Sequence, residues 1–130
     1  MSIKHTLVFI LVCICFNNIL GQEKGPEISF ETKQIDYGII KNNSNGQRTF
    51  SFINTGDENL IIIDVRSSCG CTIPKKPDEP ILPGEKSKII VQYDTKNRQG
   101  SFKKTITVTT NIEENPIVEL RIIGTVLPRN

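Results

Sequence analysis

Two cysteines close together in the middle of the chain are the residues best suited to chemistry. Cys69 and Cys71 flank Gly70 in the stretch RSSCGCTIPKKP, residues 66–77. Two thiols at this spacing have four possible uses: a disulfide, a redox pair, a soft-metal clip, or simple packing. Which of them applies depends on how the chain turns between the two residues.

The distance between the two cysteines decides whether they can be bonded to each other. In an extended strand the Cα atoms of residues i and i+2 lie about 6.5 Å apart, at ~3.3 Å rise per residue. Their Cβ atoms then lie beyond the ~3.5–4.5 Å that a disulfide needs. Gly70 could relieve this by turning the chain, because glycine accepts backbone angles closed to other residues. The bridge would close a very small ring, so we expect it to stabilise little and to be easily reduced. Our hypothesis is that Cys69 and Cys71 are oxidised and pin the turn.

Packing and metal binding stay open as alternatives for the same pair. Both cysteines can serve as small packing residues at the end of a strand. Two thiolates on one turn also suit a two-coordinate soft ion such as Cu(I). However, the only His and the only Met, His5 and Met1, lie near the start of the chain, in a segment predicted to be removed. A third ligand of either type is therefore not expected, and we predict no cofactor.

Enzymatic chemistry other than thiol chemistry has little support in the sequence. Without His in the mature chain, a Ser-His-Asp or Cys-His nucleophile system cannot be built. Ser101 and Lys104 match the motif S-x-x-K, but the alternating strand pattern around them is the wrong context for it. We predict that Lys103 and Lys104 are surface or edge charges. The sequence therefore predicts no catalytic residues and a protein that is not an enzyme.

The first 21 residues have the order of a secretory signal peptide. A basic start at Lys4 precedes an apolar run at 7–16, and two polar residues follow. The run is too short to cross a bilayer as a helix, which takes about 20 residues. We predict cleavage between Gly21 and Gln22, without lipid attachment, and export to the periplasm or the cell exterior. No membrane association is expected after cleavage.

The charge balance limits the class of partner. The full chain has 16 basic and 14 acidic residues, and the basic ones are scattered along it. Such a balance argues against nucleic-acid binding by charge. The residues after the leader suffice for one small domain.

The residues after the predicted leader have the pattern of short strands separated by turn signals, with no helical stretch. Apolar and polar residues alternate in most strands, as Ile35, Tyr37 and Ile39 do in QIDYGII. The run Leu60–Val65 is apolar without alternation and is predicted to pass through the core. A segment with four prolines, residues 74–83, is predicted as a loop or a sheet edge.

Seven or eight such strands predict an all-β fold, an immunoglobulin-like β-sandwich. We place the sandwich at residues 28–127, after a short linker at 22–27. The usual inter-sheet disulfide and core tryptophan of antibody domains are missing. The inner faces are expected to include Phe50, Phe52, Ile89, Val91, Tyr93, Ile106, Val108, Leu120 and Ile122.

The succession of motifs along the chain is specific, although each motif alone would be weak. It consists of N-T-G at Asn54–Gly56, S-C-G-C-T at Ser68–Thr72, P-G-E at Pro83–Glu85, I-x-V-x-Y-x-T at Ile89–Thr95, R-x-G-x-F at Arg98–Phe102 and K-x-I-x-V-x-x-N at Lys104–Asn111. This succession resembles the bacterial family called domain of unknown function 1573, over roughly residues 28–126. The resemblance implies a secreted or envelope-located domain with an immunoglobulin-like fold, similar to Hydin-type domains. It implies no catalytic residues.

Two functional interpretations follow. The first is an exported, non-enzymatic module that contacts unknown envelope proteins or stiffens a surface assembly in the bacterial envelope, with strand addition at a sheet edge as the mechanism. The alternative is a thiol-redox or soft-metal protein that uses Cys69 and Cys71.

Overall fold

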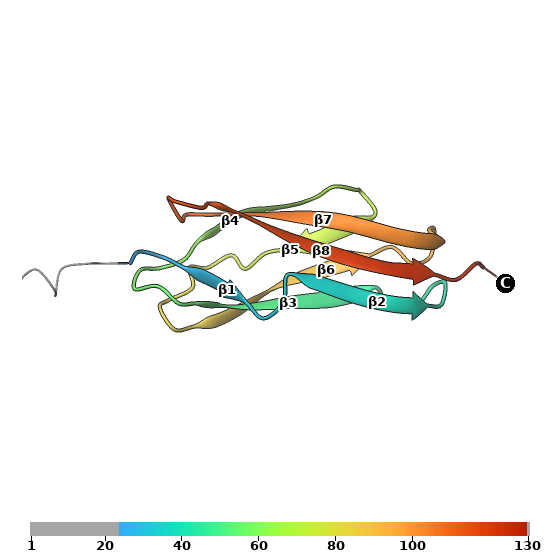
Figure 1. Ribbon diagram of the computed structural model, residues 1–130, viewed down its shortest axis with the longest axis horizontal. Helices are drawn as coiled ribbons and strands as arrows, with labels where there is room; N and C mark the ends of the chain where they lie inside the picture. Colours follow the sequence, from blue (N-terminus) through green and yellow to red (C-terminus); the bar gives the residue numbers. More distant parts are fainter. Residues whose placement is uncertain (1–23, 130) are drawn as a thin grey trace, which may run out of the picture.

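The protein is an eight-stranded sandwich of two sheets, as shown by a computed structural model that describes residues 24–129 (Figure 1). No helix occurs in this range, as predicted. The strands are β1 (Ile28–Phe30), β2 (Gln34–Ile40), β3 (Gln47–Asn54), β4 (Ile62–Ser67), β5 (Thr72–Lys75), β6 (Lys86–Tyr93), β7 (Gly100–Thr110) and β8 (Ile117–Val126).

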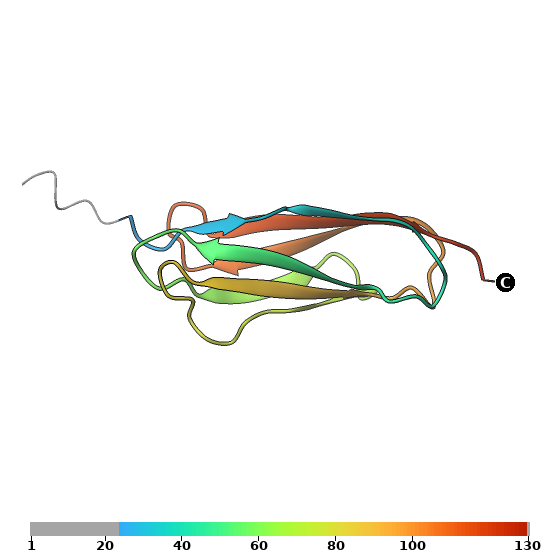
Figure 2. The same cartoon turned by 90° about the horizontal axis from the view of Figure 1, so that it is seen from below.

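The strands form two layers that face each other across the core (Figure 2). One sheet has the order β1-β3-β6-β5 and the other the order β2-β8-β7-β4. All pairs are antiparallel except β2 and β8, which run parallel. The chain changes sheet at every connection except those between β5 and β6 and between β7 and β8. Because β4 and β5 are both edge strands, the connection between them joins the edge of one sheet to the edge of the other.

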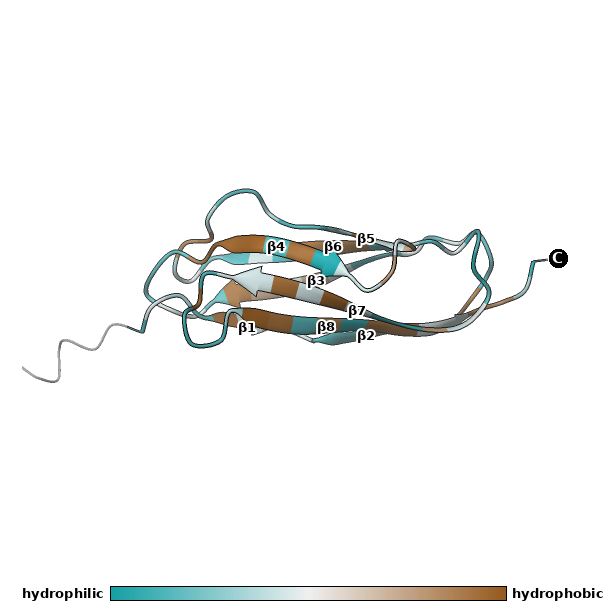
Figure 3. Cartoon of the chain, turned by 90° about the horizontal axis from the view of Figure 1, so that it is seen from above, coloured by the Kyte–Doolittle hydropathy of each residue, from teal (hydrophilic) through white to brown (hydrophobic). Residues whose placement is uncertain are grey.

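Alternation along the strands produces the core, because successive side chains of a strand point to opposite faces. Figure 3 shows apolar and polar residues following one another along several strands. All nine residues predicted for the inner faces are buried, which confirms that prediction. Tyr37, Tyr93 and Phe102 form an aromatic cluster in this core, with the rings of Tyr93 and Phe102 stacked at a centroid distance of 4.0 Å.

Two details of the predicted strands are wrong. The run Leu60–Val65 does not pass through the core as a whole. It lies at a sheet edge, where Ile61 and Ile63 are 43% and 55% exposed while Leu60 and Ile62 are buried. Buried and exposed side chains therefore alternate along this apolar run, and two of its isoleucines face the solvent.

The alternation predicted for β2 fails at Ile39, which is 75% exposed. Gly38 has a φ of 67°, a left-handed conformation that glycine adopts readily, and the register with β8 shifts between Asp36 and Ile39. This bulge reverses the facing of the residues after it, so Ile40 is the half-buried one.

The structure describes only part of the N-terminal segment for which predictions were made. The predicted signal peptide, with its cleavage site at Gly21, lies outside the described residues. The part of the linker that is described, 24–27, contacts the domain: the backbone N–H groups of Lys24 and Gly25 donate to the Asp57 carboxylate, at 2.8 and 2.7 Å. Within residues 24–129 there is no helix of the length and apolarity that a membrane span requires.

One buried polar residue was not singled out by the sequence. Asn54, at the end of β3, is fully buried. Its side-chain amide donates to the carbonyls of Glu58 (2.7 Å) and Ile81 (2.9 Å), and its side-chain oxygen accepts from the N–H of Gly56 (2.9 Å). The N-T-G motif is therefore more than a turn signal, because its first residue joins the loop after β3 to the segment that contains Ile81.

Candidate functional site

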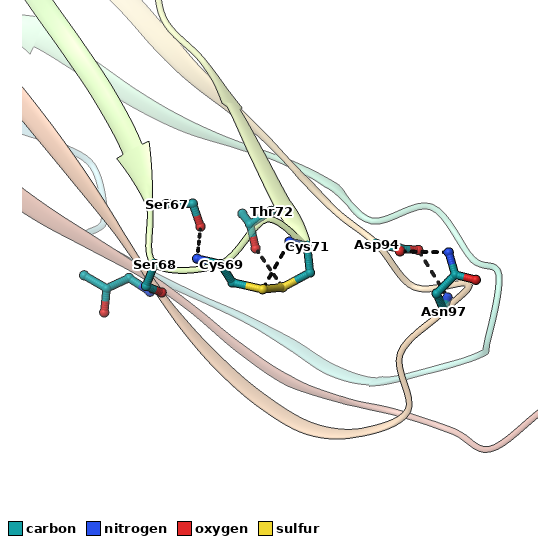
Figure 4. The surroundings of a disulfide bond; sticks show 8 residues. Ser67, Ser68, Cys69, Cys71, Thr72, Asp94 and Asn97 are labelled. Carbon is teal, nitrogen blue, oxygen red and sulfur yellow. Dashed lines mark hydrogen bonds between the residues drawn. A yellow bond between two sulfur atoms is a disulfide. The ribbon is translucent and has the colours of Figure 1, made fainter.

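The candidate site is the turn that carries the chain from β4 to β5 (Figure 4). Stacked sheets lie about 10 Å apart, and only Ser68–Cys71 separate these two edge strands. So short a crossing needs a sharp turn, and the turn is closed by the N–H of Thr72, which donates to the carbonyl of Cys69 at 3.2 Å. The cysteines occupy the first and third positions of this turn.

The turn brings the two cysteines together. Their Cα atoms lie 5.2 Å apart, closer than in an extended strand, and their sulfurs are bonded as a disulfide at 1.99 Å. The geometry that our hypothesis requires is therefore present. In this oxidised form neither sulfur is a free thiolate, so the soft-metal alternative would need the reduced pair.

The reason we gave for Gly70 is wrong. Its backbone is not among those with positive φ, so the turn does not use a conformation reserved for glycine. A Cβ built on Gly70 would meet no atom within 4 Å. Neither backbone angle nor crowding therefore demands glycine, and its main effect is to leave the space beside the bridge open.

The two sulfurs have unequal surroundings. Cys71 is only 5% exposed and belongs to the core, whereas Cys69 is half-buried and packs against the edge of that core. The backbone N–H of Cys71 donates to the Sγ of Cys69 at 3.1 Å, as the dashed line in Figure 4 shows. The Sγ of Cys71 has a more distant polar neighbour, the hydroxyl of Thr72 at 3.8 Å. No pattern in the sequence indicated this asymmetry.

Backbone hydrogen bonds hold the turn on both sides, independently of the disulfide. On the β4 side, the N–H of Ser68 donates to the carbonyl of Thr105 (3.0 Å), and the N–H of Thr105 donates to the Ser68 hydroxyl (3.2 Å). On the β5 side, the N–H of Asp94 donates to the carbonyl of Cys71 at 2.8 Å. The turn is thus fixed to β7 of one sheet and to the residue that follows β6 of the other.

A shallow hollow of about 440 Å³ adjoins the turn on the β5 side. Gly70, Cys71 and Ile73 line it together with the segment 92–97, and Ile73 is 68% exposed. At its rim, hydrogen bonds from the side chain and backbone of Asn97 hold the pKa of the Asp94 carboxyl below its usual value. Burial raises the pKa of Tyr93 above its usual value.

The other candidates do not assemble into a site. Ser101 is exposed and its hydroxyl lies 3.2 Å from that of Thr125. Positions three apart on a strand point to opposite faces, so Ser101 and Lys104 do not converge. Lys103 is exposed as predicted, whereas Lys104 is half-buried. Within residues 24–129 no cluster of three or more His, Cys, Asp or Glu side chains is arranged to hold a metal ion.

Comparison with known proteins identifies a family but no activity. The family model described as "Protein of unknown function (DUF1573)" matches residues 28–126, the range over which the motifs resembled that family. A search of curated proteins finds no match.

Several solved structures share the fold at low sequence identity. A protein of unknown function from Porphyromonas gingivalis W83 has a TM-score of 0.69 at 14% identity over 83% of this chain and 50% of its own. The Vibrio cholerae VesB protease has a TM-score of 0.61 at 11% identity, over 75% of this chain and 31% of its own. A chain of the CsuC–CsuE chaperone–tip adhesion subunit pre-assembly complex from Acinetobacter baumannii has a TM-score of 0.57 at 12% identity, over 77% and 57%.

These likenesses establish the fold alone. The chain spans about a third to a little over half of the length of these three solved chains. They include a protease and a chaperone complex, and one immunoglobulin-like sandwich can carry many functions. The function therefore has to be argued from the chain's own surface and site.

Proposed function

We propose a function for this chain, which belongs to the DUF1573 family of proteins of unknown function. It is an exported, non-enzymatic module of the bacterial envelope, and it binds another protein through a sheet edge. The family and the β-sandwich fold are consistent with a non-enzymatic domain. Export rests on the leader at residues 1–21 and protein binding on the edge strands.

One observation carries the proposal: three of the four edge strands each present a strongly exposed isoleucine. These are Ile39 on β2, Ile63 on β4 and Ile73 on β5, at 75%, 55% and 68% exposure. An edge strand offers unpaired backbone N–H and C=O groups to an incoming strand. A neighbouring apolar side chain then adds contact area, which is the combination used in strand addition. The structural likeness to a chain of a chaperone–subunit complex supports the same interpretation.

The three edges are not equally suited to this role. β5 has four residues and includes Pro74, which has no N–H to donate. β4 has a register irregularity near Ile63. β2 has seven residues, but its bulge falls near Ile39. Each edge is thus short or interrupted, which limits unspecific pairing while leaving room for one defined partner.

Site-directed cross-linking in the native host tests the proposal. Single replacements Ile39→Lys, Ile63→Lys and Ile73→Lys should leave folding intact, because the side chains are exposed. At least one should abolish a specific adduct that the unaltered protein forms. Lys103→Ala, at an exposed position of the inner strand β7, is the matched control. If no adduct forms above background, or if all three variants retain it, edge-mediated protein binding is wrong.

Export is tested separately by intact-mass analysis of protein from the natural host. The expected mass is that of a chain beginning at Gln22. A mass of the full chain from Met1, or one raised by a lipid, would contradict the predicted processing.

A further inference from the structure

We infer that the Cys69–Cys71 bridge is a thiol–disulfide exchange site, in which Cys69 forms the mixed disulfide with an incoming thiol and Cys71 is the buried second thiol. The inference is independent of the proposed protein-binding function. It rests on the unequal burial of the sulfurs, on the hydrogen bond to one of them, and on the open space at Gly70.

Access decides which sulfur is attacked. Exchange needs a thiolate to approach a sulfur along the S–S axis, so burial of a sulfur blocks the reaction there. Cys71 is packed in the core, while Cys69 is half-buried at its margin. The incoming thiolate therefore reaches the Sγ of Cys69.

The hydrogen bond favours the same sulfur in the reverse reaction. When the pair is reduced, the N–H of Cys71, 3.1 Å from the Sγ of Cys69, stabilises negative charge there. A thiolate that is both stabilised and accessible is the attacking group in exchange. Opening and closing of the bridge pass through the same mixed disulfide. Both reactions therefore place the bond to the incoming thiol on Cys69.

The step balances in atoms and electrons. A thiolate R–S⁻ attacks the Sγ of Cys69, the bond between the two sulfurs breaks, and the electron pair leaves on the Sγ of Cys71, which takes a proton from water. A second thiolate attacks the R sulfur, releasing Cys69 and forming R–S–S–R. Two thiols are oxidised and the protein disulfide is reduced. The reductant is thus any thiol, from a small molecule or from a protein cysteine.

The fold keeps both sulfurs in place while the bridge is open. The bonds from Ser68 to Thr105 and from Asp94 to Cys71 do not involve the sulfurs. The two thiols of the reduced protein consequently stay within one turn of each other, at a high effective concentration for closing the bridge again.

Gly70 explains why a thiol can approach at all. Neither its φ nor any close contact requires glycine, yet any side chain at this exposed position would stand beside the bridge.

The experiment uses the oxidised mature protein under native conditions, with glutathione and with an extended cysteine-containing peptide as separate probes. After acid quenching, peptide mapping of the trapped mixed disulfide should find the probe on Cys69, at least about tenfold in excess over Cys71. Single-cysteine variants, Cys71→Ala and Cys69→Ala, should show the same order in their reaction with glutathione disulfide. A faster reaction of the peptide would support a protein thiol as partner, and equal rates would support small thiols.

A pair of variants at Gly70 separates access from folding. Gly70→Leu should slow opening of the bridge by glutathione about fivefold or more, while Gly70→Ala should slow it less, both with unchanged circular dichroism. The inference is overturned if neither probe opens the bridge unless denaturant is present, if the mixed disulfide forms on Cys71, or if Gly70→Leu opens at the unaltered rate.

Discussion

Reduction of the disulfide should weaken the fold only slightly, because the bridge joins two residues that are only two positions apart in the chain. In the chain-entropy model, a cross-link stabilises by restricting the unfolded chain, and the effect grows with the logarithm of the closed loop. The loop here runs from residue 69 to residue 71. For three residues the model gives about 1.6 kcal/mol at 25 °C, roughly half its value for a 15-residue loop.

The noncovalent contacts of the turn support the same expectation. The bonds of Thr72 to Cys69, Asp94 to Cys71 and Ser68 to Thr105 all remain possible after reduction. The Cys71 side chain also stays in the core, since a thiol occupies almost the same space. A domain of this size is stable by about 5–15 kcal/mol, so the reduced protein should remain folded.

Urea unfolding followed by far-ultraviolet circular dichroism, with and without a phosphine reductant, measures this loss directly. Alkylation after each experiment confirms that the bridge was intact or open. We expect the free energy of unfolding to fall by about 1–2 kcal/mol with an unchanged slope. A loss above about 3 kcal/mol, or unfolding on reduction alone, would refute the reasoning and make the bridge a main structural support.

Three further predictions concern the core and its buried polar groups. Asn54→Ala should cost about 2–4 kcal/mol in urea unfolding, because it removes three hydrogen bonds between a buried side chain and backbone groups; a loss below 1 kcal/mol would contradict the role assigned to its amide. Val91→Ala should cost on the order of 1–3 kcal/mol and Lys103→Ala little, and equal losses would contradict the assigned faces. Burial raises the pKa of Tyr37 to about 12 from 10.0, so the stability that its neutral form contributes is complete below pH 10 and is lost as the pH rises toward 12. Tyr37→Phe should therefore lose less stability between pH 9 and pH 11 than the unaltered protein in the same urea assay, and an equal loss would contradict this assignment.

The sequence predicted the sandwich well because most of its strands have one face toward the core and one toward water. In β3, β6 and β7, a period of two residues is visible in the sequence and returns as buried and exposed positions. The buried residues of these strands could therefore be named in advance. Prediction from alternation failed in the strands where the sequence does not show the alternation of apolar and polar residues.

The failures have local physical causes. In Leu60–Val65 every side chain but Asp64 is apolar, so composition hides the alternation, and nothing in the run reveals that its strand lies at an edge. In β2, a single glycine with φ 67° shifts the register and turns Ile39 outward. Asn54 gave no signal either, because its partners lie on segments as far away as Ile81. Such contacts depend on tertiary structure, which periodicity does not contain.

The C-x-C spacing shows most clearly what only the fold could supply. In a continuous strand the same residues would be too far apart to bond, and we expected the backbone freedom of Gly70 to relieve this. Instead, the change of sheet between two edge strands forces a turn at this point, and the turn brings the Cα atoms of Cys69 and Cys71 to 5.2 Å. Because one side of the turn continues into β5 and the core, Cys71 is buried, while Cys69 stays at the margin. The proximity of the sulfurs and their unequal access thus have a single cause, the crossing from one sheet edge to the other.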